Sequence, residues 1–122
     1  MKNILSAILF CSCMSVVCLG YEAPAVPDMV RAVYNAEGGP DATFLYGIRS
    51  VHYSSPEEAR RICERSVINS IKRWNKSGRP CDFVEFMSRR YCPVHAPNDP
   101  HGVNRYWVKN VRFYLAHQSE KR

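Results

Sequence analysis

Residues 55–78, SPEEARRICERSVINSIKRWNKSG, decide the fold of this chain. Ser55 is a good helix N-cap, Pro56 suits the first helical position, and Glu58 stands where a capping box needs an acidic residue. Apolar side chains then recur every three or four residues until Gly78, which favours a helix end. The apolar positions are Ala59, Ile62, Cys63, Val67, Ile71 and Trp74. The segment therefore predicts a long amphipathic helix with one buried face.

Two shorter helices are predicted on the C-terminal side of this segment. The first has Asp82 as its cap and Glu85 three residues later, and it ends before Cys92-Pro93 because the residue before a proline disfavours the helical conformation. After a loop, Asn104 can cap a last helix, and residues 119–122 form a polar tail that we expect to fray. The apolar stripe of the last helix contains Trp107, Val108, Val111, Tyr114 and Leu115.

A fourth helix is predicted on the N-terminal side, with Asp28 as its N-cap and Gly38-Gly39-Pro40 as its end. Residues 41–54 alternate apolar and polar side chains around Tyr46-Gly47, which is compatible with a short hairpin or an irregular loop. Four helices with one apolar face each predict an all-α, or mostly α, domain over residues 26–118. The apolar stripe of the fourth helix contains Met29, Val30, Val33, Ala36 and, in its last turn, Glu37.

Length and composition favour a single exported domain. The chain has 122 residues, of which 46% are apolar and 23% are charged, and this balance excludes an intrinsically disordered protein and a multi-domain enzyme. Lys2 precedes an apolar run over residues 4–19 that is typical of a signal peptide, with cleavage after Gly20 or after Ala25. We therefore expect residues 1–20 to direct export to a periplasmic or secreted location. Membrane contact is expected only through an uncleaved signal.

The number of cysteines changes once the signal is removed. Three of the six lie within residues 1–20, which leaves Cys63, Cys81 and Cys92 in the mature chain. Three thiols form at most one disulfide among themselves, and we expect it between Cys63 and Cys92, with the third thiol left over. Closing that loop would contribute roughly 3 to 4 kcal/mol to stability. Cys92 and His95 have a spacing that a zinc ion can use, but the other Cys and His residues are irregularly spaced. We expect neither a metal nor another cofactor.

Glu37 is the most unusual residue of the predicted helices. A carboxylate on a buried helix face, near the negative end of the helix dipole, is hard to ionise, so we expect its pKa to be raised. A carboxyl group that stays protonated near neutral pH can act as the general acid in glycoside cleavage. The alternative is that Glu37 lies at the helix end and faces water.

The order of several short motifs is informative about the family. Glu37-Gly38-Gly39 is followed by Tyr46-Gly47-Ile48, then by DFVEFMSRRYCP at residues 82–93 and by the segment 104–111. In this order they resemble the region around the catalytic Glu of the lysozyme-like superfamily and the two helices that follow it. The similarity is to soluble lytic transglycosylases and goose-type lysozymes in particular, and it implies a compact lysozyme-like helical domain.

The resemblance also implies a reaction and a set of roles. A single Glu, here Glu37, would act first as acid and then as base on the bond between N-acetylmuramic acid and N-acetylglucosamine in peptidoglycan. Tyr91 matches the family's late tyrosine, whose hydroxyl hydrogen-bonds near the catalytic Glu. The candidate substrate-binding residues are Tyr46, Gly47, Tyr91, Asn104 and Tyr106.

Three positions depart from the family pattern. Gly38 replaces the usual Ser after the Glu, and Ile48-Arg49 replaces the usual Met-Gln pair. These departures affect how the substrate would be positioned.

A second carboxylate would separate a two-acid hydrolase from a one-acid transglycosylase. Asp41 is the only nearby candidate, and an Asp after Pro40 is typical of a turn. Without a second acid, the acetamido group of the substrate would have to stabilise the intermediate, which favours an anhydro-sugar product over hydrolysis.

The basic charge of the chain supports a second hypothesis from a different class. The formal net charge is +6, which suits an anionic partner. The protein could be a non-catalytic secreted helical protein that binds a cell-wall polymer or a membrane surface. We expect no nucleic-acid partner, because basic and stacking aromatic residues are not interleaved, and we expect a monomer.

Overall fold

The computed structural model of the protein describes residues 20–118, and this part of the chain is all-α, as predicted. It contains four α-helices, three short 3-10 helices and no strand. The predicted signal peptide, apart from Gly20, and the predicted tail at 119–122 lie outside the described residues. The α-helices are α1 (Val26–Ala36), α2 (Pro56–Lys76), α3 (Phe83–Tyr91) and α4 (Trp107–Gln118). The 3-10 helices are η1 (Gly39–Asp41), η2 (Leu45–Gly47) and η3 (Val103–Tyr106).

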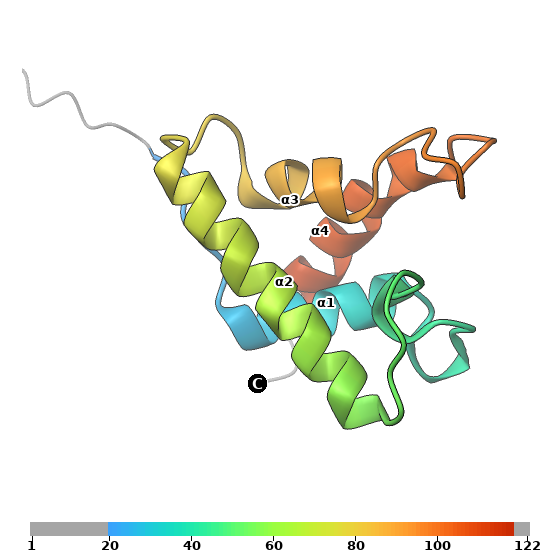
Figure 1. The fold of residues 1–122 in the computed structure, drawn as a ribbon. Coiled ribbons are helices and arrows are strands. Elements are labelled where there is room, and N and C mark those ends of the chain that lie inside the picture. The colour runs from blue at the N-terminus through green and yellow to red at the C-terminus, as the bar shows by residue number, and fades with distance from the viewer. Residues whose placement is uncertain (1–19, 119–122) are drawn as a thin grey trace, which may run out of the picture.

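The helices pack around one apolar core. The long helix α2 crosses in front of α1 and α4 in the view of Figure 1, and α3 lies beside α2 and α4. Helix α1 packs against both α2 and α4, so the first and last helices of the described chain are neighbours. The side chains with no exposed surface come from all four helices, and they include Met29, Val33, Cys63, Val67, Trp74, Met87 and Val111. Each predicted apolar stripe thus contributes to the same core.

Helix α2 begins as its capping signature predicts. The hydroxyl of Ser55 accepts a hydrogen bond from the backbone N–H of Glu58 at 3.1 Å. The carboxylate of Glu58 accepts from the backbone N–H of Ser54 at 2.8 Å, so the return bond of the capping box is made one residue earlier than the pattern predicts. Gly78 follows the end of α2 with φ +77°, as expected for a helix stop.

The starts of the first and last helices differ from the prediction. Helix α1 begins at Val26, two residues before Asp28, because Pro27 is compatible with the first helical turn, and Asp28 lies in that turn instead of capping it. Asn104 does not cap the last helix, because η3 precedes α4 and the Asn104 amide donates to the carbonyl of Pro93 at 2.8 Å. The observed starts of these two helices therefore differ from the predicted ones, whereas the buried faces agree with the prediction.

The buried carboxylate of Asp99 organises the loop between α3 and α4. It accepts backbone N–H groups from His95 at 3.1 Å, Val103 at 2.7 Å and Asn104 at 3.1 Å. Burial disfavours the ionised form, but these three hydrogen bonds outweigh it and keep the pKa of Asp99 below its ordinary value. Asp99 therefore performs, for this loop, the capping role that the sequence pattern assigned to Asn104.

The stretch between α1 and α2 is an irregular loop, the second of its two predicted alternatives. It contains η1 and η2, and Tyr46 within η2 has φ +56°. The hydroxyl of Tyr53 accepts the backbone N–H of Leu45 at 2.9 Å, which closes the loop on itself. Within residues 20–118, no helix combines the length and apolar character needed to span a lipid bilayer.

Candidate active site

Glu37 lies at the C-terminal end of α1 and turns its side chain toward the core. Its backbone N–H donates to the carbonyl of Val33 at 3.0 Å, which completes the last helical turn. Its carboxyl Oε1 accepts the indole N–H of Trp107 at 2.9 Å, and Trp107 is buried at the start of α4. The carboxyl group is therefore held between the first and last helices, half-buried, and not at an open helix end.

Burial raises the pKa of Glu37 above its ordinary value, in the predicted direction. The hydrogen bond from Trp107 and the positive charge of Arg49 favour the carboxylate, but their effect is smaller. Glu37 is thus a carboxyl group biased toward its protonated form, with a neutral donor holding one oxygen. That is the electrostatic environment that a general acid requires.

Gly47 lies directly against this carboxyl group. A Cβ atom at this position would come within 2.6 to 2.7 Å of the carboxyl atoms of Glu37, and Gly47 has φ +68°. Both the contact and the backbone conformation require glycine here. The structure therefore brings Glu37 and the predicted loop residue Gly47 into one site.

Tyr91 supports the loop that carries Gly47 and does not bind Glu37 directly. Its hydroxyl donates to the backbone carbonyl of Tyr46 and lies 3.9 Å from the sulfur of Cys63, and its ring centroid is 5.6 Å from that of Trp107. Burial raises the pKa of Tyr91, so the hydroxyl keeps its proton. Tyr91 links the end of α3 to the loop beside the carboxyl group.

The predicted disulfide between Cys63 and Cys92 is absent, and the three cysteines of the described chain are unpaired. Cys63 is fully buried on α2 beside the Tyr91 hydroxyl. Cys92 follows α3 and is among the residues that line a separate hollow, with Pro93 and Asn104. Burial raises the pKa of each of these two thiols to about 12, which keeps both protonated and unreactive at neutral pH.

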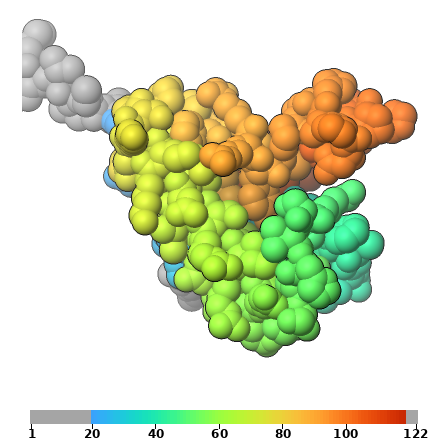
Figure 2. Space-filling model, viewed as in Figure 1, coloured from blue at the N-terminus to red at the C-terminus, as the bar shows by residue number. Residues whose placement is uncertain are grey.

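A groove opens beside the site, and we call it the central groove. Figure 2 shows the surface hollowed where the loop before α2 faces α3 and the loop that follows it. The groove has a volume of about 350 Å³, and Gly47 and Tyr91 lie on its wall. Glu37 is not among the residues that line the groove, but Gly47 is, and a Cβ atom added to Gly47 would meet the Glu37 carboxyl group. The full lining is Gly47, Ile48, Arg49, Ser50, Val51, Ile62, Ser66, Asn69, Ser70, Arg73, Arg90 and Tyr91.

The other predicted site residues lie outside this arrangement. Asn104 fixes the loop through Pro93 and lines the hollow of Cys92, and the exposed Tyr106 has the Arg105 guanidinium 5.0 Å from its ring centroid. None of the contacts described for Asn104 or Tyr106 reaches Glu37. Asp41, the only candidate for a second acid, is exposed in η1.

Two residues that sequence reasoning did not assign to the site belong to it. Trp107 was predicted as core, but its indole N–H also holds Glu37, and the need of a buried Trp for a hydrogen-bond acceptor is the signal that points to such a partner. Arg49 acts on the carboxyl group through its charge. Among residues 20–118, no three His, Cys, Asp or Glu side chains are grouped to hold a metal ion.

Comparisons with protein-family models, curated proteins and solved structures found no match.

Trp107→Phe is expected to raise the pKa of Glu37 further, because it removes the donor that favours the carboxylate. Loss of this half-buried hydrogen bond should also lower the free energy of unfolding by about 1 to 3 kcal/mol. The measurement is an NMR titration of the Glu37 side-chain carboxyl carbon.

Trp74→Phe is the matched control. Trp74 is also buried, and its indole N–H donates to a backbone carbonyl, that of Cys81, at 2.8 Å. This variant should lose stability while the pKa of Glu37 stays unchanged. An unchanged or lower Glu37 pKa in Trp107→Phe would contradict the role given to the indole.

Proposed function

We propose that this protein cleaves the glycan strands of peptidoglycan, with Glu37 as the single group that acts as general acid and then as general base. The observation that carries the proposal is the half-buried Glu37 carboxyl group, held by the Trp107 indole and packed close to Gly47, a residue of the central groove. The resemblance of the motifs to lytic transglycosylases and goose-type lysozymes supports it. The substrate lies outside the cytoplasmic membrane, which agrees with the signal peptide expected at residues 1–20.

The first step uses a proton on Glu37, whose pKa is raised by burial. This proton passes to the oxygen of the glycosidic bond, the bond from that oxygen to C1 of N-acetylmuramic acid breaks, and the oxygen leaves as a hydroxyl of the next sugar. The acetamido oxygen of the same muramic acid residue bonds to C1 and stabilises the positive charge there. No second protein carboxylate is required, which agrees with the exposed position of Asp41 in η1.

The second step uses Glu37 as the base. The carboxylate formed in the first step takes the proton of the C6 hydroxyl, whose oxygen attacks C1 and displaces the acetamido oxygen. The product carries a 1,6-anhydro ring and no water is consumed. Glu37 is protonated again and ready for the next bond. The hydrogen bond from Trp107 holds one carboxyl oxygen throughout, so the other oxygen carries the proton.

Mass analysis of the products tests this proposal. Purified peptidoglycan is incubated with the protein, and the released fragments are separated and weighed. Anhydro ends, one water lighter than reducing ends, are the expected result. Reducing ends would show hydrolysis and contradict the second step. Retention on the polymer that salt abolishes, with no fragments released, would contradict the enzymatic proposal and favour the non-catalytic binder.

A further inference from the structure

We propose that the central groove binds the carboxylate groups of the peptide that peptidoglycan carries on its muramic acid residues, with Arg73 and Arg90 as the anion-binding residues. This inference rests on the proposed function and adds to it a recognition site for the peptide part of the substrate. It concerns binding and assigns these arginines no part in the chemistry at Glu37.

The charge of the groove lining is one-sided. Three arginines, Arg49, Arg73 and Arg90, are among its lining residues, and no Asp or Glu is. The guanidinium of Arg49 lies 5.0 Å from the ring centroid of Phe44 and its charge also acts on Glu37. The ion pairs of the described chain use other arginines, and they are Arg60–Glu64, Arg89–Glu85 and Arg112–Asp82. Positive charges that line one groove without an acid favour an anion between them. The groove is therefore complementary to a negatively charged ligand.

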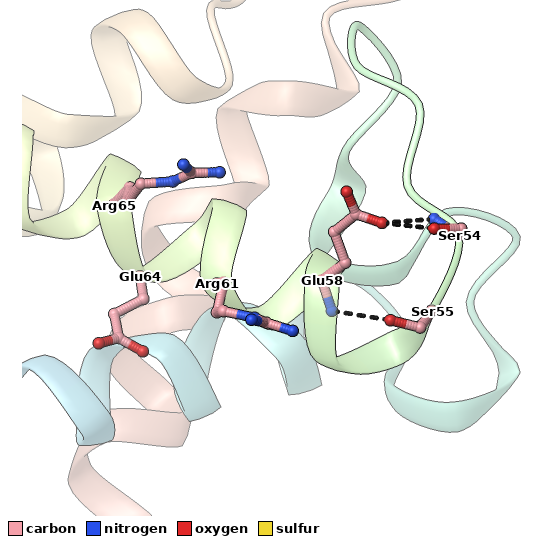
Figure 3. Close-up of a pocket in the computed structure, with 6 residues that line it drawn as sticks. All are labelled: Ser54, Ser55, Glu58, Arg61, Glu64 and Arg65. Atoms are coloured by element: carbon pink, nitrogen blue, oxygen red, sulfur yellow. Dashed lines mark hydrogen bonds between the residues drawn. The ribbon is translucent and has the colours of Figure 1, made fainter.

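The hollow on the outer face of α2 differs from the central groove in its charge, whereas the hollow beside Cys92 also has two arginines, Arg89 and Arg105, and no acid in its lining. The hollow on α2 has a volume of about 510 Å³ and is drawn in Figure 3. It is lined by two arginines, Arg61 and Arg65, and also by two acids, Glu58 and Glu64. The formal charges of the lining sum to zero, although Glu64 is ion-paired with Arg60, which lies outside it. Arginine on α2 is thus matched by acid on one side of the helix and left unmatched on the other.

The polar lining of the central groove suits a peptide carboxylate in shape as well as charge. The guanidinium of Arg73 donates to the hydroxyl of Ser70 at 3.1 Å, and the buried Ser70 fixes its direction. Arginine binds carboxylates through two parallel hydrogen bonds, which a fixed guanidinium favours. Ser66 and Asn69 add groups that can hydrogen-bond to peptide amides.

The position of the central groove is compatible with a peptide ligand that is covalently attached to the glycan strand. One wall contains Gly47, which touches the carboxyl group of Glu37. A glycan strand placed for cleavage at Glu37 would therefore carry the substituents of its muramic acid residues past this wall. A carboxylate-bearing peptide is the anionic substituent of that residue.

Binding measurements separate this inference from the proposed function. The protein carries Glu37→Gln, so that the probes are not cleaved, and two soluble glycan fragments are titrated by calorimetry. One fragment keeps its tripeptides with free carboxylates, and the other has had them removed by an amidase. Arg73→Gln with Arg90→Gln should weaken binding of the peptide-bearing fragment by about tenfold or more, as expected for each lost charge-assisted hydrogen bond. Binding of the peptide-free fragment should not change.

Arg61→Gln with Arg65→Gln is the matched control, because it removes the same charge from the other hollow of α2. It should bind both fragments as the Glu37→Gln parent does. Equal weakening by the two double variants would show a general charge effect and overturn the inference. Equal affinity of the parent for the two fragments would overturn the inference and leave the proposed function intact. Failure of the parent to bind either fragment would contradict the proposed function as well. Circular dichroism confirms that each variant is folded.

Discussion

Glu37→Gln should reduce peptidoglycan cleavage by at least about 10²- to 10⁴-fold, the contribution typical of a positioned general acid or base. Gln keeps the size of the side chain and can still accept the indole hydrogen bond of Trp107 through its amide oxygen. It has no proton to transfer to a leaving oxygen. The release of soluble fragments from purified peptidoglycan is the measurement.

The same variant should keep or increase the stability of the fold at neutral pH. Because the folded-state pKa of Glu37 is raised above the ordinary value of 4.5, the folded protein binds this proton more tightly than the unfolded chain does. Its contribution to stability is present in full below about pH 4.5 and is lost as the pH rises through the folded pKa. Gln removes this contribution to the pH dependence of stability. The free energies of unfolding from denaturant titrations at several pH values would show the difference between the two proteins.

Glu57→Gln provides the control for this prediction. Glu57 is exposed in the first turn of α2, so the change removes a carboxyl group of the same kind away from the groove. Activity should stay at the level of the unchanged protein. Cleavage that persists in Glu37→Gln would refute the assignment of the catalytic group, whatever the control shows.

Gly47→Ala is the second prediction with a large expected effect. The new methyl group would come within 2.6 to 2.7 Å of the Glu37 carboxyl atoms and has to displace them. A misplacement of about 1 Å at a reacting group can reduce the rate by about 10²-fold. Because Gly47 has φ +68°, the left-handed conformation should also reduce stability by about 1 to 2 kcal/mol. Activity and thermal unfolding are measured on the same preparation.

Gly78→Ala separates the two effects of that substitution. Gly78 has φ +77°, but nothing lies within 4 Å of the position of its Cβ. It should therefore lose similar stability and keep full activity. If both alanine variants lost activity in parallel, the loss would follow from backbone strain alone, and the contact between Gly47 and Glu37 would have no role in catalysis.

The fold was largely predictable because its signals are local. Ser55 and Asp82 mark helix starts through hydrogen bonds to residues three positions away, and both bonds are present. The last helix start was misassigned because Asp99 bonds three backbone groups across a loop, an arrangement with no fixed sequence spacing. Tyr46 adopts positive φ, which a non-glycine residue rarely does and which its neighbours in sequence do not signal.

The candidate site was predictable only in part, because some of its contacts join residues that are far apart in sequence. The helical period placed Glu37 on the buried side of its helix and thus predicted the direction of its pKa shift. Its partner Trp107 lies 70 residues later and reaches it only because α1 packs against α4. The sequence pattern does not indicate that these two helices pack against each other. Cys63 and Cys92 are suitably separated in sequence for a disulfide, but sequence separation carries no information on the direction of their side chains.

The distance along the chain between Glu37 and Trp107 also determines how late in synthesis the site is completed. A ribosome completes α1 long before it reaches α4, so an unfinished polypeptide already contains the carboxyl group but lacks the indole that holds it. The same is true of a fragment cut by a protease anywhere before residue 107. Premature products of translation or degradation therefore lack the hydrogen bond that holds this carboxyl group, and under the proposed function only molecules whose last helix has been made and docked would cleave the wall.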